Sequence, residues 1–287
     1  MSGQLRWTKR WPFRIARTVL VALGAWCLIL VILGMAFSDR FLFYPTKYPE
    51  GSWDQRDHAS IPIQEVEVAA RDGTKLVAWY ARPPNPRATF LFFHGNAGNV
   101  SDRLSILEQL ATLGIETFAA GYRGYGKSGG TPSSAALPDD AESAYHCVTQ
   151  QYGVKPDKLI LFGKSLGGAA AVHVASRNPC AGLIVQSSFT SVKDMASKLV
   201  PYFPIGVFMG RKLDNLSAIA TVKVPTLVIH GKADEIIPFE QGVRLFEAAP
   251  QPKWFAQYDD ADHNGLISRH RKEWQKDLGD FVGKCVK

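Results

Sequence analysis

The chain has 287 residues, of which 46% are hydrophobic, and this suits one α/β domain of ordinary size with a small appendage. Its formal net charge is +7, but five basic residues precede the first acidic one, Asp39, and the rest is near balance, with 28 basic residues (33 less these five) against 26 acidic ones. This balance argues against a nucleic-acid partner. The four widely spaced cysteines argue against a zinc site and a disulfide framework.

An uncharged apolar segment follows the basic N-terminus. Residues 18–38 carry no charge and are long enough to cross a bilayer as a helix. We interpret residues 1–17 as a cytosolic tail and 18–38 as an uncleaved transmembrane anchor. A cleaved signal peptide is the alternative, although its apolar region should be shorter. The basic residues ahead of the segment predict a cytosolic N-terminus and a domain beyond the membrane, on the periplasmic side of the inner membrane in a bacterium.

Residues 39–60 combine aromatic residues with prolines and are too irregular for one long element. We interpret them as a juxtamembrane arm, whose aromatic residues lie either at the lipid headgroups or against the main domain. That domain, residues 61–287, begins with an alternating strand over 63–68, a turn at Asp72-Gly73 and a returning strand over 75–81. The sequence therefore predicts an antiparallel start.

A buried strand over 88–93 ends in a glycine-rich loop, which reads His94-Gly95-Asn96-Ala97-Gly98-Asn99. Ser101 is expected to cap a helix that runs to Leu113, and another strand covers 115–120. This alternation of apolar strands with helical segments predicts a mostly parallel sheet with helices on both faces.

The loop after that strand matches two motifs. Gly121 to Ser128 fits the phosphate-binding pattern G-x-x-x-x-G-K-[ST], and Gly126 to Gly130 fits G-x-S-x-G. A phosphate-binding loop must run directly into a helix, whereas two glycines and Pro132 follow here. We therefore expect Ser128 to be a loop residue, and keep nucleotide binding as the alternative.

A second G-x-S-x-G has the expected surroundings. An apolar strand over 158–162 turns through Gly163-Lys164-Ser165-Leu166-Gly167 into a helical segment. A strand that turns sharply into a helix at this motif is the nucleophile elbow of an α/β-hydrolase, so Ser165 is the predicted nucleophile. The amides of Leu166, at the start of that helix, and Asn96, in the loop after the third strand, form the predicted oxyanion hole.

Residues 191–224 follow a strand over 182–187 and include an apolar stretch interrupted by prolines. Because folds of this kind insert caps at this place, we interpret the segment as a short lid that lines an acyl pocket. A helix with ordinary core contacts is the alternative.

An acid and a base lie in the loops after the last two predicted strands. Asp234 follows the strand over 226–231, and His263 follows the strand over 253–258. Ser165, Asp234 and His263 therefore occur in the order Ser, Asp, His, each behind a strand, as in an α/β-hydrolase triad.

Four other residues near these loops are weaker candidates. Asp260 and Asp262 lie too close to His263 in the chain to come from the preceding strand. His94 precedes the serine in chain order and His230 precedes its loop, so we expect both histidines to be structural.

Several segments resemble the membrane-anchored α/β-hydrolases related to the yeast bud-emergence protein. They are His94-Gly95 with Asn96 to Asn99, Tyr122 to Gly126 with Ser128, Gly163 to Gly168, Ser188-Phe189-Thr190, His230-Gly231 with Asp234, and His263-Asn264. The resemblance runs from about Phe41 to the C-terminus. It implies a serine hydrolase similar to monoacylglycerol lipases, lysophospholipases and protein depalmitoylases. Gly121 departs from the Asp that is frequent in that family, so no polar role is carried over to it.

These patterns together predict a membrane-anchored serine hydrolase that cleaves carboxylic esters or thioesters, with small-molecule or lipid esters as substrates. No metal or organic cofactor is expected, because no ligand cluster or metal-binding motif occurs. A serine peptidase with the same triad is the first alternative, and a non-catalytic membrane-tethered interaction domain is the second. The sequence leaves the oligomeric state open.

Overall fold

The computed structural model describes residues 11–199 and 213–286. Within these residues, eight strands form one sheet in the order β10-β9-β8-β7-β4-β6-β3-β2. Their bounds are β2 (Ile63–Ala69), β3 (Lys75–Ala81), β4 (Ala88–Phe93), β6 (Ile115–Ala120), β7 (Leu159–Lys164), β8 (Gly182–Gln186), β9 (Thr226–Gly231) and β10 (Lys253–Tyr258). β3 is antiparallel to β2 and to β6, and the other pairs are parallel. The predicted mostly parallel sheet with an antiparallel start is confirmed.

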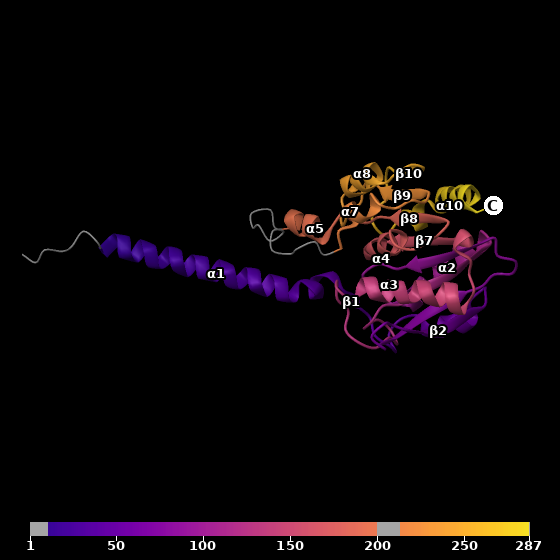
Figure 1. The fold of residues 1–287 in the computed structure, drawn as a ribbon, viewed down its shortest axis with the longest axis horizontal. Helices are drawn as coiled ribbons and strands as arrows, with labels where there is room; N and C mark the ends of the chain where they lie inside the picture. The colour runs from indigo at the N-terminus through magenta and orange to yellow at the C-terminus, as the bar shows by residue number, and fades with distance from the viewer. Residues whose placement is uncertain (1–10, 200–212, 287) are drawn as a thin grey trace, which may run out of the picture.

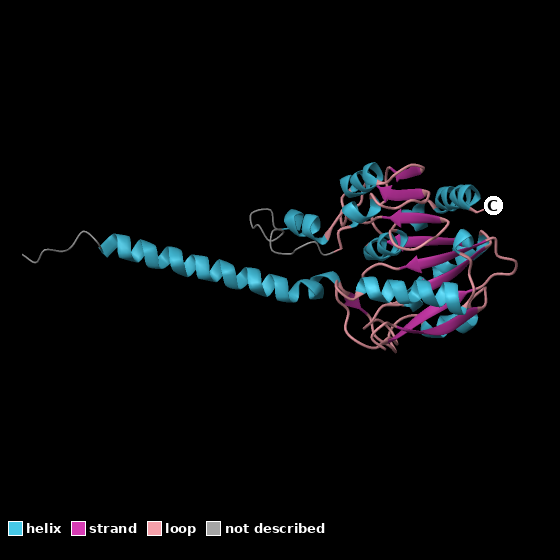
Figure 2. Cartoon of the chain, viewed as in Figure 1, coloured by secondary structure: helices cyan, strands magenta, loops and turns pink. Residues whose placement is uncertain are grey.

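Helices cover both faces of the sheet (Figure 2). One face carries α3 (Leu137–His146), α4 (Leu166–Ala175), α7 (Asn215–Ile219) and α8 (Phe239–Ala248), and the other carries α2 (Leu104–Thr112) and α10 (Arg271–Cys285). The central strands β4, β6 and β8 are buried along their whole length and largely apolar because each lies between two helical layers. In β4, Leu91 and Phe93 pack in one layer while Phe90 and Phe92 pack in the other. Two hydrophobic cores therefore hold the carboxyl ends of the strands in place.

Short segments complete the described chain. They are β1 (Tyr44–Pro45), β5 (Ala97–Gly98), α5 (Val192–Leu199), α9 (Leu266–Arg269), the 3-10 segments η1 (Trp53–His58), η2 (Val100–Arg103) and η4 (Pro156–Lys158), and the π segment η3 (Cys147–Gln151). The predicted cap at Ser101 is wrong. Asn99 begins η2 instead, because its side chain accepts from the Ser101 N–H at 2.8 Å and Asp102 accepts from the Asn99 N–H, also at 2.8 Å. This reciprocal capping box starts the segment earlier than expected.

The N-terminal helix α1 (Trp11–Leu42) extends away from the domain, on the side where α5 lies (Figure 1). The arrows of the central parallel strands point towards that same side (Figure 2). Among the residues whose placement is described, no helix is long and apolar enough to cross a membrane. The anchor expected over residues 18–38 stays a prediction.

The arm after α1 packs on the domain. β1 pairs in parallel with β5, and the buried Trp53 ring lies 5.5 Å from the ring of Trp79 in β3. Tyr44 and Tyr48 remain exposed. The buried residues of the arm therefore contact the domain, which is one of the two arrangements expected for the arm.

The predicted lid over 191–224 is described only at its two ends. α5 lies at the start of this segment and α7 lies near its end, and Ile219 of α7 is fully buried in the core. Its apolar centre, residues 200–212, lies outside the described residues, so the lid stays a prediction.

Candidate active site

Ser165 lies where β7 turns into α4, with a backbone φ of +55° and ψ of −120°. Positive φ is rare for a residue with a Cβ, and such strain clusters at functional sites. Two glycines allow the turn to be this tight. A Cβ at Gly163 would lie 2.2 Å from the Gly167 carbonyl oxygen, and a Cβ at Gly167 would lie 2.0 Å from the Phe93 carbonyl oxygen. Larger residues would therefore separate β7, α4 and the neighbouring β4.

The three predicted triad residues lie in contact. His263 Nε2 is 3.1 Å from Ser165 Oγ, and His263 Nδ1 is 2.7 Å from Asp234 Oδ2. A carboxylate offers only acceptors, so Nδ1 carries the proton and Nε2 is free to accept from the serine hydroxyl. All three residues are buried. These distances fall in the range that a general base needs towards a nucleophile and towards the acid that orients it.

The environment of Asp234 keeps its carboxylate charged. One oxygen accepts the backbone N–H groups of Ile236 at 3.0 Å and Ile237 at 2.8 Å, while His230 Nε2 lies 3.4 Å from the other oxygen. Burial favours the neutral acid, but hydrogen bonds with His230 and His263 outweigh it and hold the pKa of Asp234 well below its ordinary value. Asp234 is therefore ionised near neutral pH.

The two weaker acid candidates have other partners. Asp260 Oδ1 lies 2.6 Å from His270 Nε2. Asp262 Oδ1 accepts the backbone N–H groups of Asn264 at 3.0 Å and Gly265 at 2.6 Å. Within the described ranges, Asp234 is the carboxylate that contacts the imidazole of His263.

Asn96 helps to fix its loop through three hydrogen bonds. Its carbonyl oxygen accepts from the Tyr44 N–H at 3.0 Å and from the Tyr125 hydroxyl at 2.6 Å. Its side-chain amide donates to the carbonyl oxygen of Leu42, the last residue of α1, at 3.1 Å. Two of these bonds come from α1 and the arm, so a segment outside the predicted catalytic domain helps to hold the predicted oxyanion loop.

The loop and the start of α4 flank Ser165. A Cβ at Gly95 would lie 3.5 Å from the Ser165 Cβ, so the loop backbone passes directly beside the nucleophile. Leu166 is the first residue of α4, where backbone N–H groups have no partner within the helix. The predicted donors thus lie on segments that border the serine.

His94 is the first residue of the loop that carries Asn96 and is fully buried. Its Nδ1 is 2.7 Å from the Gly95 carbonyl oxygen, and its own carbonyl oxygen accepts from the Tyr122 hydroxyl at 2.9 Å. Burial, assisted by the positive charge of Arg103, lowers the pKa of His94 to about 3. A neutral imidazole bound to the backbone agrees with the structural role expected for it.

The competing motif at Ser128 is a packed loop. Ser128 Oγ accepts the backbone N–H of Val77 at 2.9 Å, and a Cβ at Gly121 would lie 2.0 Å from the Val77 carbonyl oxygen. The next helix, α3, does not begin until Leu137. The phosphate-binding alternative is therefore wrong, and close approach to β3 explains why position 121 is a glycine.

Two contacts to the backbone of the nucleophile were not expected from the sequence. Ser188 Oγ donates to the Ser165 carbonyl oxygen at 2.8 Å, and the Ser165 N–H donates to the Gln186 carbonyl oxygen, also at 2.8 Å. A Cβ at Gly168 would lie 2.2 Å from Ser188 Oγ. Ser188-Phe189-Thr190 was part of the family resemblance, but a serine after a strand carries no further signal of this role.

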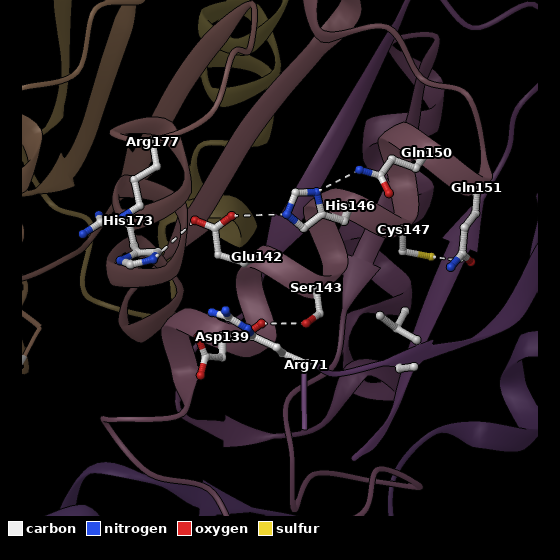
Figure 3. A pocket seen from close by; sticks show the side chains of 12 residues that line it. Arg71, Asp139, Glu142, Ser143, His146, Cys147, Gln150, Gln151, His173 and Arg177 are labelled. Atoms are coloured by element: carbon white, nitrogen blue, oxygen red, sulfur yellow. Dashed lines mark hydrogen bonds and ion pairs between the residues drawn. The ribbon is translucent and has the colours of Figure 1, made fainter. Parts of the chain in front are cut away.

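A large cavity of 620 Å³ lies away from these residues (Figure 3). Glu142 lies between His146 and His173 there, 3.9 Å and 3.4 Å from their Nε2 atoms. None of the predicted triad residues lines this cavity. In the part of the chain that is described, no group of side chains could hold a metal ion.

Comparisons with known proteins agree with this geometry. A family model described as serine aminopeptidase, S33, matches residues 84–218. The chain is 34% identical over 255 residues to the uncharacterised protein YfhR of Escherichia coli K12, covering 85% of this chain and 86% of YfhR. It is 32% identical over 252 residues to protein Bem46 of Schizosaccharomyces pombe, covering 82% and 83% of the two chains. The solved structure of the Pyrococcus furiosus esterase Pf2001 matches with a TM-score of 0.70 at 21% identity, covering 86% of this chain and 98% of the esterase.

Proposed function

This chain belongs to the Bem46-like family of α/β-hydrolases and is a serine hydrolase, and we propose that it cleaves carboxylic esters or thioesters of acyl-lipid-like substrates through Ser165, His263 and Asp234. The observation that carries this proposal is the continuous line of contacts from the Asp234 carboxylate through His263 to Ser165 Oγ. The strained turn that holds Ser165 gives it further support.

The proposed reaction has two halves. Ser165 Oγ attacks the substrate carbonyl carbon while its proton moves to His263 Nε2. The amides of Asn96 and Leu166 stabilise the resulting oxyanion, and Asp234 stabilises the imidazolium through Nδ1–H. The tetrahedral species then releases the alcohol or thiol, which takes the proton from His263, and an acyl-enzyme remains. Water attacks the acyl-enzyme by the same route, which returns a carboxylic acid and free Ser165.

We propose further that residues 18–38 anchor the protein in a membrane, with the N-terminus cytosolic and the catalytic domain on the periplasmic side of a bacterial inner membrane. The basic residues at one end of this uncharged segment support the orientation. The carboxyl ends of the central strands face the side from which α1 extends, and Leu42 at the end of α1 contacts Asn96. An anchor there would place the active site towards lipid, which favours acyl-lipid substrates.

A serine peptidase is the second candidate, because the matching family model is described as a serine aminopeptidase. The same triad serves both reactions, so it does not separate them. A panel of matched substrates does: short-chain 4-nitrophenyl esters, the corresponding thioesters, and amino-acid 4-nitroanilides. We expect turnover of the first two classes and at least about 10² lower kcat/KM on anilides. Preference for the anilides would replace the esterase proposal with the peptidase one.

A further inference from the structure

A second cavity, of 290 Å³, lies next to the predicted active site. Three of its lining residues are chain neighbours of the site residues: Gly95 precedes Asn96, Lys164 precedes Ser165, and Asn264 follows His263. The remaining lining comes chiefly from η2, α2, α9 and the first residue of α10. The cavity therefore borders the three segments that carry the nucleophile, the oxyanion loop and the base, while its lining includes neither Ser165 nor His263.

The lining of this cavity is basic. Arg103, Lys164 and Arg271 contribute three positive charges, and Asp102 is its one carboxylate among the described residues. Asp102 Oδ2 already accepts the backbone N–H of Asn99 at 2.8 Å. The cavity thus has a net positive charge, and its single acid is already engaged.

Several of its polar groups have no partner within the protein. Arg103 donates from Nη2 to the Ala97 carbonyl oxygen, but its Nε is buried without an acceptor. The side-chain oxygen of Gln109 is buried without a donor. Across the described ranges, the side chains of Lys164 and Arg271 form neither a hydrogen bond nor an ion pair.

Burial lowers the pKa of Lys164 to about 8, with the charge of Arg103 as the next cause. The charges of Asp234 and Asp262 offset this effect only in part. A partly buried charge without a direct partner opposes folding, which is the pattern expected where a ligand supplies the counter-charge.

We propose that this basic cavity binds an anionic group, a carboxylate or a phosphate, that the substrate carries close to its scissile carbonyl. The inference rests on the proposed function and narrows its substrate class. A volume of 290 Å³ suits a compact charged group rather than a long acyl chain. The guanidinium groups of Arg103 and Arg271 offer paired donors that match carboxylate and phosphate oxygens, and Lys164, the residue before the nucleophile, adds a point charge.

Two pairs of soluble substrates test the cavity and identify the part of the substrate that enters it. The first pair places the charge on the acyl side: 4-nitrophenyl pentanoate against the mono-4-nitrophenyl ester of glutarate. The second places it on the alcohol: glycerol monobutyrate against the butyrate monoester of glycerol 3-phosphate. The full-length protein should favour the anionic member of at least one pair by about tenfold or more in kcat/KM, as one charge-assisted hydrogen bond predicts.

The ratio of kcat/KM for the anionic substrate to kcat/KM for its neutral partner is then measured in variants. Arg271→Gln, at an exposed position, and Lys164→Met should each lower the ratio at least about threefold. Arg177→Gln is the control, because Arg177 lines the separate cavity of Figure 3, and it should leave the ratio unchanged. A wild-type ratio near one in both pairs, or an equal fall in all three variants, overturns the cavity proposal while ester hydrolysis stands. No hydrolysis of any substrate contradicts the proposed function itself.

Discussion

Several hydrogen bonds together keep the carboxylate of Asp234 ionised. Two backbone N–H groups and two histidines surround its carboxylate, and together they outweigh the effect of burial on its pKa. Asp234→Asn keeps the size of the side chain but removes the charge that selects the Nδ1–H tautomer of His263. We expect the fold to persist and kcat on a soluble ester to fall by about 10⁴, by analogy with the same change in a serine protease triad. A loss below about tenfold, measured on protein with an unchanged circular dichroism spectrum, would contradict this role.

Lys164 is the opposite case, because burial destabilises its positive charge in the native state. Its folded pKa of about 8 lies below the ordinary value of 10.5, so the unfolded chain binds more protons between these two pH values. Stability therefore rises with pH across this window, and the penalty is complete below pH 8. Lys164→Met should raise the melting temperature at pH 7 by about 2–4 °C, equivalent to roughly 1 kcal/mol, and by less at pH 10. Lys155→Met, at an exposed lysine, should show no such pH-dependent gain.

At the scale of elements, the arm and the oxyanion loop act as one unit. The Thr46 N–H donates to the Gly98 carbonyl oxygen at 3.0 Å, next to the bond from the Tyr44 N–H to Asn96. Thr46→Pro removes that donor and should loosen the loop. We expect kcat to fall by about 10² with KM changed less than about threefold, because an oxyanion donor acts mainly in the transition state. Lys47→Ala changes an exposed side chain of the same arm and is the matched control. Equal kinetics in the two variants would show that the arm does not position the loop.

The helices, the strands and the candidate triad were predictable because they follow from the types of residue and from their order in the chain. The strands before Ser165 and Asp234 contain apolar runs, and the edge strand before His263 mixes apolar and polar residues. The three residues follow these strands in the order that the fold dictates. The contacts of Asn96 with Leu42 and Tyr44 were not predictable, because in each of them α1 or the arm contributes a backbone carbonyl or N–H, which any residue supplies. The cap was assigned wrongly because Asn99 and Ser101 are both good capping residues. The choice between them depends on Asp102, whose side chain accepts from the Asn99 N–H and completes the capping box.

At the scale of the whole molecule, α1 and the domain should have separable roles. Deleting residues 1–37 removes most of the uncharged segment but keeps Leu42 and the whole arm. We expect the truncated protein to leave the membrane fraction and to keep its kcat on a short soluble ester within about twofold. Its activity on bilayer-resident esters should fall, because the tether raises their local concentration. Loss of turnover on the soluble ester would show that α1 contributes to the chemistry as well as to location.

The direction of insertion has its own test. Five basic residues precede the uncharged segment, so a tag at the N-terminus should be cytosolic and the domain should face away from the cytosol. Protease added to cells with a permeabilised outer envelope should then digest the domain and spare the tag. Digestion of the tag with protection of the domain would invert the topology. A mature N-terminus near Phe37 would identify the segment as a cleaved signal peptide.

The central claim is that Ser165 is the nucleophile, and not Ser128 of the G-x-S-x-G match at Gly126 to Gly130. Its most direct test is labelling of the wild type, Ser165→Ala and Ser128→Ala with a fluorophosphonate, followed by mass spectrometry of the labelled peptide. Ser165 Oγ lies 3.1 Å from His263 Nε2, whereas Ser128 Oγ accepts from the Val77 backbone. We predict that the label maps to Ser165, disappears in Ser165→Ala and persists in Ser128→Ala. A label that survives in Ser165→Ala and disappears in Ser128→Ala would contradict the whole site.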